Sequence, residues 1–142
     1  MFDDFSEQIT YDTVAGMAYI FLTEPFKFEV TYTVELPENP DLNLDVGSEV
    51  PIVGIELGGK SAKKISALKV EDKQFLTKIK EDGEVFLSFR FENKPICKSV
   101  SFEGSEEVKF LFADDNCFDF IGVEIYGKNP HYQKYLSYKT SP

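Results

Sequence analysis

The segment Ile52–Leu57 (IVGIEL) returns 68 positions later as Phe120–Ile125 (FIGVEI), with glycine third and glutamate fifth in both copies. Two distant segments with the same pattern indicate an internal repeat, and a repeat must be recognised before a fold is assigned. The two segments are rich in β-branched and apolar residues, which favour strands. The pattern therefore predicts two related β-rich units in one chain.

Other parts of the two halves align at nearly the same offset. Three pairs of segments match, namely residues 31–34 with 99–102, residues 42–44 with 110–112 and, at an offset of 67, residues 18–22 with 85–89. A one-residue difference is what a change of length in one loop would produce. We therefore predict a duplication in which the strands of both units follow in the same order.

The length and composition predict one domain. A chain of 142 residues with 14 Phe and 7 Tyr can bury a substantial core. We expect an α+β fold, mainly antiparallel β-sheet and sandwich-like, over residues 1–142. Its parts are expected to be two units, residues 8–59 and 83–127, a helical linker, residues 60–82, and a short C-terminal helix and tail, residues 128–142.

Local patterns give the expected elements. Residues 27–36 alternate, with Phe28, Val30, Tyr32 and Val34 on one face, which predicts a half-buried strand. Residues 37–40 and 45–48 are expected to be turns. Gly54 weakens its strand, so we expect a bulge or a close backbone approach there.

The linker and the C-terminus carry helix signals. Ser61 is a candidate cap for a first helix, and Phe75, Leu76 and Ile79 form one apolar stripe of a second. In the C-terminal segment, Asn129 is expected to cap a short helix that begins at Pro130.

The charge is negative and uneven. The formal net charge is −10, and residues 60–82 carry seven Lys against four acids, so the rest of the chain carries about −13. Such a surface repels nucleic acid and anionic membranes and attracts basic proteins. The acidic first residues and the lack of a long apolar run favour a cytoplasmic protein. Cys97 and Cys117 are then expected to be reduced thiols.

The first unit resembles the domain of unknown function 2283 family. The matching motifs are Tyr11-Asp12, Tyr19-Ile20, the acidic turn from Asp45 to Glu49, and the closing strand Gly54-Ile55-Glu56-Leu57, followed by a segment from Ser61 onward. The resemblance covers residues 8–68, and the Asp that usually precedes the apolar strand is Gly16 here. The family implies a small β-sheet with a helix and no known chemistry.

Glu56 and Glu124 are the candidate polar pair, because they occupy equivalent positions in the repeat. If the units pack about a pseudo-two-fold axis, the two carboxylates approach each other and suit acid–base chemistry or cation binding. The alternative is that each stabilises its own strand. We expect no catalytic residue and no cofactor. We also expect no metal site, since the acidic turn at Asp114 and Asp115 lacks the spacing of a calcium-binding loop.

Three functions fit the sequence. The first is a non-catalytic, acidic, protein-binding module, such as an immunity or antitoxin-like protein that neutralises a basic toxin or nuclease. The second is a structural β-protein that self-associates, for example as a homodimer. The third is a small-ligand or metal-binding protein that uses a cleft between the two units. The residues expected to contact a basic partner are Asp45, Glu49, Glu106, Glu107, Asp114 and Asp115.

Overall fold

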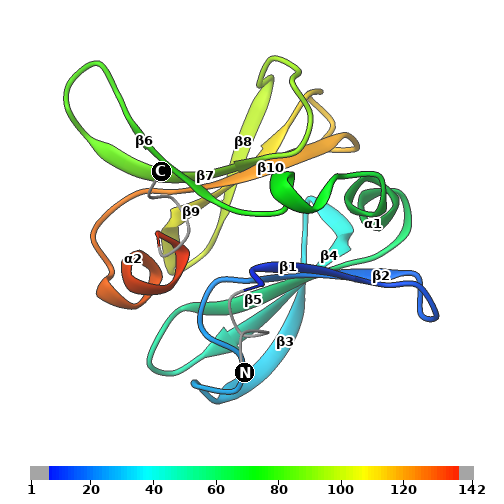
Figure 1. The fold of residues 1–142 in the computed structure, drawn as a ribbon, viewed down its shortest axis with the longest axis horizontal. Helices are drawn as coiled ribbons and strands as arrows, with labels where there is room; N and C mark the ends of the chain where they lie inside the picture. Colours follow the sequence, from blue (N-terminus) through cyan, green and yellow to red (C-terminus); the bar gives the residue numbers. More distant parts are fainter. Residues whose placement is uncertain (1–6, 138–142) are drawn as a thin grey trace.

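Two antiparallel sheets face each other in the computed structural model, which describes residues 7–137 (Figure 1). The first sheet has the order β1-β2-β5-β4-β3 and the second the order β6-β7-β10-β9-β8. The strands of the first are β1 (Ile9–Asp12), β2 (Met17–Phe21), β3 (Val30–Leu36), β4 (Asn39–Gly47) and β5 (Ile52–Leu57). The strands of the second are β6 (Leu76–Ile79), β7 (Val85–Arg90), β8 (Lys98–Phe102), β9 (Ser105–Phe112) and β10 (Phe120–Ile125). The expected α+β fold with two related β-rich units is confirmed.

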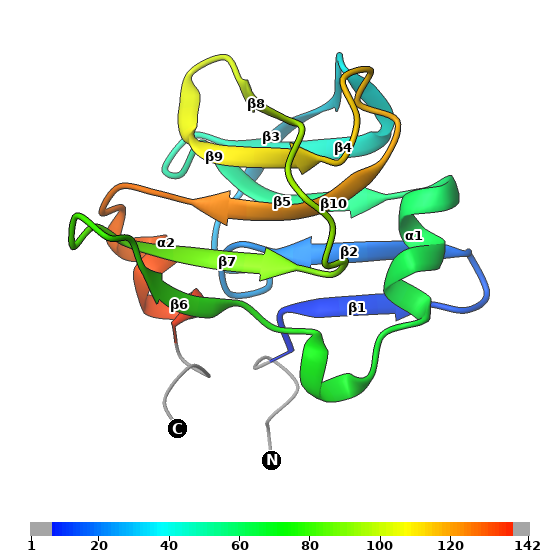
Figure 2. The ribbon, with the colours of Figure 1, turned by 90° about the horizontal axis from the view of Figure 1, so that it is seen from above.

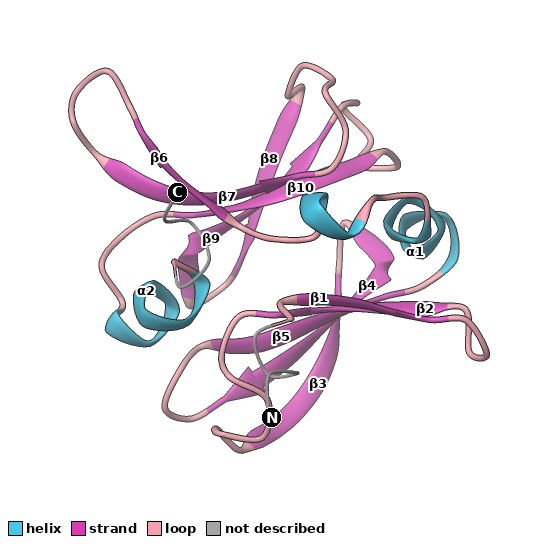
Figure 3. Ribbon diagram, viewed as in Figure 1, coloured by secondary structure: helices cyan, strands magenta, loops and turns pink. Residues whose placement is uncertain are grey.

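Helical segments are short and flank the sheets. Helix α1 (Gly59–Ser66) follows the first sheet, and helix α2 (Pro130–Leu136) follows the second. Between α1 and β6 the chain forms one 3-10 turn, η2 (Val70–Asp72). Figure 3 shows that strands make up most of the fold, with α1 and α2 on its two sides. Within residues 7–137, no helix is long and apolar enough to cross a lipid bilayer.

The repeat is visible in the sheet order, because β6 to β10 occupy the places of β1 to β5. The register corrects the offsets that the sequence suggested. In the first unit Ala18 and Leu42 both pair with the last residue of β5, and in the second unit Leu87 and Val108 pair with the last residue of β10. The offsets are thus 69 for β2 and 66 for β4, each two residues from the expected value. A slip of two residues leaves the inward and outward faces unchanged, so hydrophobic alternation cannot detect it.

The core lies between the two sheets. Alternate residues of every central strand point into it, including Ile20, Leu44 and Ile55 from the first sheet. The second sheet contributes mainly phenylalanine, and the ring of Phe120 lies 5.3 Å from Phe91 and 5.6 Å from Phe112, centroid to centroid. Offset and edge-on aromatic pairs at these distances add to the energy of apolar burial.

Strand β3 is more exposed than its alternation predicts. It lies at the edge of the first sheet, where Val30 is 40% and Tyr32 is 53% exposed, and only Val34 and Leu36 of this strand pack into the core. An edge strand has a neighbouring strand on one side only, so its alternation shows which residues share a face but not how deeply they are covered. The half-buried interpretation of residues 27–36 was therefore wrong for the first part of the strand.

The segment 60–82 is not mostly helical. Helix α1 begins at Gly59, and Ser61 lies buried inside it instead of capping it. The expected second helix is strand β6, in which Leu76 pairs with Ser88, and Phe75 before it is fully buried. Three apolar residues in a five-residue stretch fit a helix and a strand equally well, and pairing with β7 decides between them. The second sheet therefore begins before residue 83.

Two expected turns differ from the prediction, one in its position and one in its length. Strand β4 continues through Asp45 to Gly47, because Val46 is buried, and the chain turns only after Gly47. The turn before β4 uses Pro37 and Glu38 alone. At the C-terminus the expected cap is confirmed, since the Asn129 side chain accepts a hydrogen bond from the amide of His131.

Candidate functional site

The outer face of the first sheet carries a set of carboxylates with no cation among its strands. Strands β1–β5 contain no Lys or Arg. Their acids alternate with residues of the core, so their side chains lie on the outer face. We call this surface the acidic face, and its acids are Asp12, Glu35, Asp41, Asp45 and Glu56. Asp12 and Glu35 are exposed and the other three are half-buried.

Two side-chain hydrogen bonds hold the Asp45 carboxylate of the acidic face in place. Its Oδ2 accepts a hydrogen bond from the Tyr19 hydroxyl at 2.6 Å, and its Oδ1 accepts one from the Thr33 hydroxyl at 2.7 Å. Burial and this hydrogen bond raise the pKa of Tyr19 well above its usual value. The phenol therefore stays protonated and holds the negative charge of Asp45 in one place.

An aromatic surface lies beside these carboxylates. The Tyr19 ring covers Gly54, where a Cβ atom would lie 2.2 Å from the tyrosine hydroxyl oxygen. The ring of Phe21 is 4.6 Å from that of Tyr19, and both side chains are half-buried. The close backbone approach expected at Gly54 is wrong, because the group that approaches is the Tyr19 side chain. The other expectation, a bulge, fits the register of β4 and β5, which shifts directly beside Gly54. Glycine at this position lets the tyrosine lie flat across the sheet.

The second sheet differs in charge although it repeats the same scaffold. Strands β6–β10 contain four basic and three acidic residues, namely Lys78, Arg90, Lys98, Lys109, Glu106, Glu107 and Glu124. On β10 the outward-facing Glu124 lies opposite Lys109 of β9 in the strand register. Positive and negative side chains thus mix on the outer face of the second sheet, and the strongly acidic surface belongs to the first unit alone.

The structure does not bring Glu56 and Glu124 together. Each lies between core residues of its own strand, so each points away from the shared core, on the outer face of its own sheet. Glu56 is flanked by Tyr19 and Asn43 on the neighbouring strands. Glu124 accepts a hydrogen bond from the Tyr126 hydroxyl at 2.8 Å. The two carboxylates therefore lie on opposite surfaces of the molecule and do not form a pair.

The residues expected to contact a partner lie in several places. Asp45 belongs to the acidic face, and Glu49 lies in the turn between β4 and β5. Glu106 and Glu107 are in the first half of β9. Glu106 accepts a hydrogen bond from the Gly104 amide at 3.2 Å, and burial raises the pKa of Glu107. Of these four, only Asp45 is part of the acidic face.

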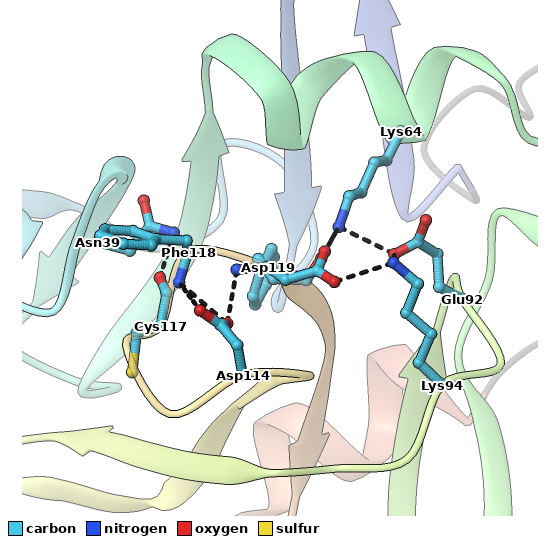
Figure 4. A network of polar contacts seen from close by, with 9 residues as sticks. Asn39, Lys64, Glu92, Lys94, Asp114, Cys117, Phe118 and Asp119 are labelled. Atoms are coloured by element: carbon cyan, nitrogen blue, oxygen red, sulfur yellow. Dashed lines mark hydrogen bonds and ion pairs between the residues drawn. The ribbon is translucent and has the colours of Figure 1, made fainter.

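The turn after β9 uses its acids to hold its own backbone. Asp114 accepts hydrogen bonds from the amides of Phe118 and Asp119 (Figure 4). Asp115 accepts one from the Cys97 thiol at 3.1 Å. Although desolvation opposes it, the hydrogen bonds from the amides of Asp119 and Phe118 lower the pKa of Asp114. Within the described residues 7–137, no three His, Cys, Asp or Glu side chains form a group that could hold a metal ion.

An ion network joins this turn to helix α1 (Figure 4). Lys64 forms ion pairs with Asp119 and, at 2.9 Å, with Glu92, while Lys94 bonds the other oxygen of Asp119 at 2.9 Å. The hydrogen bond from Lys64, followed by the one from Lys94, lowers the pKa of Asp119 to about 2. Nearby, the Asn39 side chain donates to the Cys117 carbonyl at 2.9 Å. The network therefore fixes the two units to each other.

Most acids of the acidic face were not among the functional residues predicted from the sequence. The sequence singled out Asp45 as a residue that contacts a partner and Glu56 as one of a polar pair, but it did not single out Asp12, Glu35 or Asp41. The signal was present, because acids occupy alternate positions in strands that contain no Lys or Arg. Reading it requires correct strand limits, since residues 45–48 had been expected to form a turn.

The chain is similar to a protein of Bacillus subtilis. It is 28% identical over 123 residues to "Uncharacterized protein YuzE" of Bacillus subtilis (strain 168), and the alignment covers 87% of this chain and 90% of that protein. No family model matches the chain. No solved structure matches it. The resemblance to the domain of unknown function 2283 family therefore stays a prediction.

Proposed function

We propose that this chain is a non-catalytic, cytoplasmic, protein-binding module whose acidic face docks on a basic protein. The observation that carries the proposal is the set of five outward carboxylates on strands β1–β5, which contain no Lys or Arg. A surface of one sign attracts an oppositely charged partner over a distance of about 8–10 Å at physiological salt. An immunity or antitoxin-like protein that neutralises a basic toxin or nuclease has this surface chemistry.

In this proposal the carboxylates and the aromatic side chains contribute to different properties of the interface, the association rate and the affinity. Unpaired surface carboxylates such as Glu35 raise the rate of encounter and select against acidic partners. Tyr19 and Phe21 offer contiguous half-buried ring surface at the centre of the same face, between β1 and β5. Aromatic side chains that become fully buried usually supply most of the affinity of such an interface.

The test is affinity capture with charge-neutral variants. The wild-type chain and the variant Glu35→Gln/Glu56→Gln are used to capture proteins from a lysate of the native host, and mass spectrometry identifies what is bound. Neither glutamate is needed to hold a turn or a network, so the variant keeps the fold. We expect the wild type to retain one basic protein at equal stoichiometry, which high salt releases and which the variant retains weakly.

A matched control separates the acidic face from total charge. The variant Glu81→Gln/Glu103→Gln removes two exposed glutamates from turns of the second unit and changes the net charge by the same amount. It is expected to capture the same protein as the wild type. Equal loss in both variants, or an eluate that contains only this chain, would contradict the proposal.

A second function, self-association, is favoured by one feature of the second unit. In the hairpin of β6 and β7, Ile79 pairs with Val85, and these apolar side chains are 70% and 43% exposed. Figure 1 shows the hairpin extending beyond the rest of its sheet. Analytical ultracentrifugation tests this alternative: a dimer that the variant Ile79→Lys converts to monomer would support it, and a wild-type monomer at high concentration would exclude it.

A further inference from the structure

A pocket of about 330 Å³ lies in the second unit, away from the acidic face. Its floor is the outward side of β7, and its walls are the segment 68–74, which contains η2, and the neighbouring strand β6. The charged and polar side chains that line it are Glu71, Asp72, Gln74, Lys78, Ser88, Arg90, Glu92 and Asn93. A volume of this size accommodates a small metabolite.

Two polar groups on the pocket floor have no partner within the protein. The Ser88 side chain is 2% exposed, and its hydroxyl makes no hydrogen bond. The Nε–H of Arg90 is buried and has no acceptor. Buried donors are nearly always paired, because leaving one unpaired costs free energy. Two unpaired donors side by side on a pocket floor point to an acceptor that arrives with a ligand.

Arg90 is well suited to hold an anionic group. It is the one arginine of the chain, which otherwise uses lysine. Its Nη2 donates to the Lys94 carbonyl at 2.5 Å, which fixes the guanidinium plane. Opposite it on β10 is Gly122, where a Cβ atom would lie 3.0 Å from Cδ of the arginine. A planar guanidinium held in this way matches the two oxygens of a carboxylate.

The wall formed by segment 68–74 presents negative charge to the pocket. Glu71 and Asp72 belong to η2, and both line the pocket. The third acid, Glu92, is already paired with Lys64 and Lys94. Apolar contact comes from Leu68, Leu76 and Phe91.

We propose that this pocket binds a small zwitterion of the amino-acid class, with its carboxylate at Arg90 and Ser88 and its ammonium at Glu71 and Asp72. The apolar lining favours an aliphatic side chain. This site lies on the second unit and does not depend on the protein-binding role of the acidic face. It also differs from the cleft between the units that the sequence suggested.

Nuclear magnetic resonance of the single arginine tests the proposal. Uniformly ¹⁵N-labelled protein gives one arginine Nε–H signal, which needs no assignment. L-Leucine is the probe, and two fragments are its controls: 4-methylpentanoate, which lacks the ammonium, and 3-methylbutylamine, which lacks the carboxylate. We expect leucine to shift the Arg90 signal saturably. The acid should bind about fivefold more weakly, the effect of one exposed ion pair, and the amine should leave the signal unmoved.

Variants locate the two ends of the ligand. Ser88→Ala should weaken leucine binding, whereas Ser99→Ala, which removes an exposed hydroxyl from β8, should not. Glu71→Gln/Asp72→Asn should make leucine bind as weakly as 4-methylpentanoate. The proposal is overturned if leucine produces no saturable shift, if leucine and the acid bind equally, or if Ser88→Ala and Ser99→Ala have the same effect.

Discussion

Tyr132 and Lys64 lie 68 residues apart and hold strands that are separated by the same interval. The Tyr132 hydroxyl donates to the Ile52 carbonyl at 2.7 Å, and the Lys64 ammonium donates to the Phe120 carbonyl at 2.7 Å. Helix α1 follows the first sheet but bonds the start of β10, and α2 follows the second sheet but bonds the start of β5. The two helices lie at opposite ends of the paired sheets (Figure 2). Each helix thus bonds a strand of the other unit, and these two contacts join the units into one fold.

The Tyr132 contact should contribute measurably to stability. Its hydroxyl also accepts a hydrogen bond from the Ile52 amide at 3.0 Å, and the side chain is fully buried. Tyr132→Phe leaves two buried backbone groups without this partner, which should lower the free energy of unfolding by about 1–3 kcal/mol. Urea denaturation measures the loss. Tyr32→Phe, at a tyrosine that is 53% exposed, is the control and should change little.

The contact of Lys64 with Asp119 should make stability depend on pH in the acid range. The pKa of Asp119 is lowered in the folded protein to about 2. An unfolded aspartate has a pKa of about 3.9. The ionised carboxylate therefore stabilises the fold above about pH 4, and this stabilisation is lost as the pH falls toward 2.

Two measurements check this dependence. Carbon NMR of the Asp119 carboxyl should give the low pKa directly, and Lys64→Met should move it upward. The unfolding free energy of the wild type should fall more steeply between pH 4 and 2 than that of Lys64→Met. Parallel curves for the two proteins would show that the ion pair does not stabilise the fold.

The two signature glycines should respond differently to alanine. At Gly54 the obstacle is the Tyr19 side chain, whereas at Gly122 a Cβ atom would lie 2.6 Å from the backbone oxygen of Phe89. Each alanine should cost about 1–3 kcal/mol through overpacking. Tyr19→Ala should relieve most of the cost at Gly54, and Arg90→Ala should relieve little at Gly122. Double-mutant cycles in urea measure both couplings, and equal relief at both positions would refute this distinction.

The sequence predicted the repeat, the strand-rich fold and the C-terminal cap, because these depend on local patterns. It did not predict the secondary structure or register of segments whose burial depends on residues far away in the sequence. Leu76 and Ile79 fit a helix stripe until β7 pairs with them, and the register of β4 is invisible to an alternation of period two. The predicted approach of Glu56 to Glu124 was wrong for a related reason. Equivalent outward residues of two facing sheets point in opposite directions. The unpaired donors at Ser88 and Arg90 likewise depend on chain segments brought together by folding.

The two free cysteines should differ in reactivity. Cys117 is 3% exposed, while Cys97 is exposed and donates a hydrogen bond to Asp115. That bond and the nearby negative charge raise the pKa of the Cys97 thiol, which lowers its thiolate fraction. A chromogenic disulfide reagent should modify one thiol in the native protein and two after denaturation. Asp115→Asn should accelerate the native reaction near neutral pH, and an unchanged rate would exclude this effect of Asp115.

The most direct test of the acidic face is the association rate constant with the captured basic partner, measured over a range of salt concentrations. We expect association to be fast at low salt and to slow steeply as the salt concentration rises. Glu35→Gln/Glu56→Gln should be slower at low salt and less sensitive to salt, while Glu81→Gln/Glu103→Gln should stay close to the wild type. Association that is indifferent to salt, or equally slowed in both variants, would contradict the claim that the outer face of the first sheet is the binding surface.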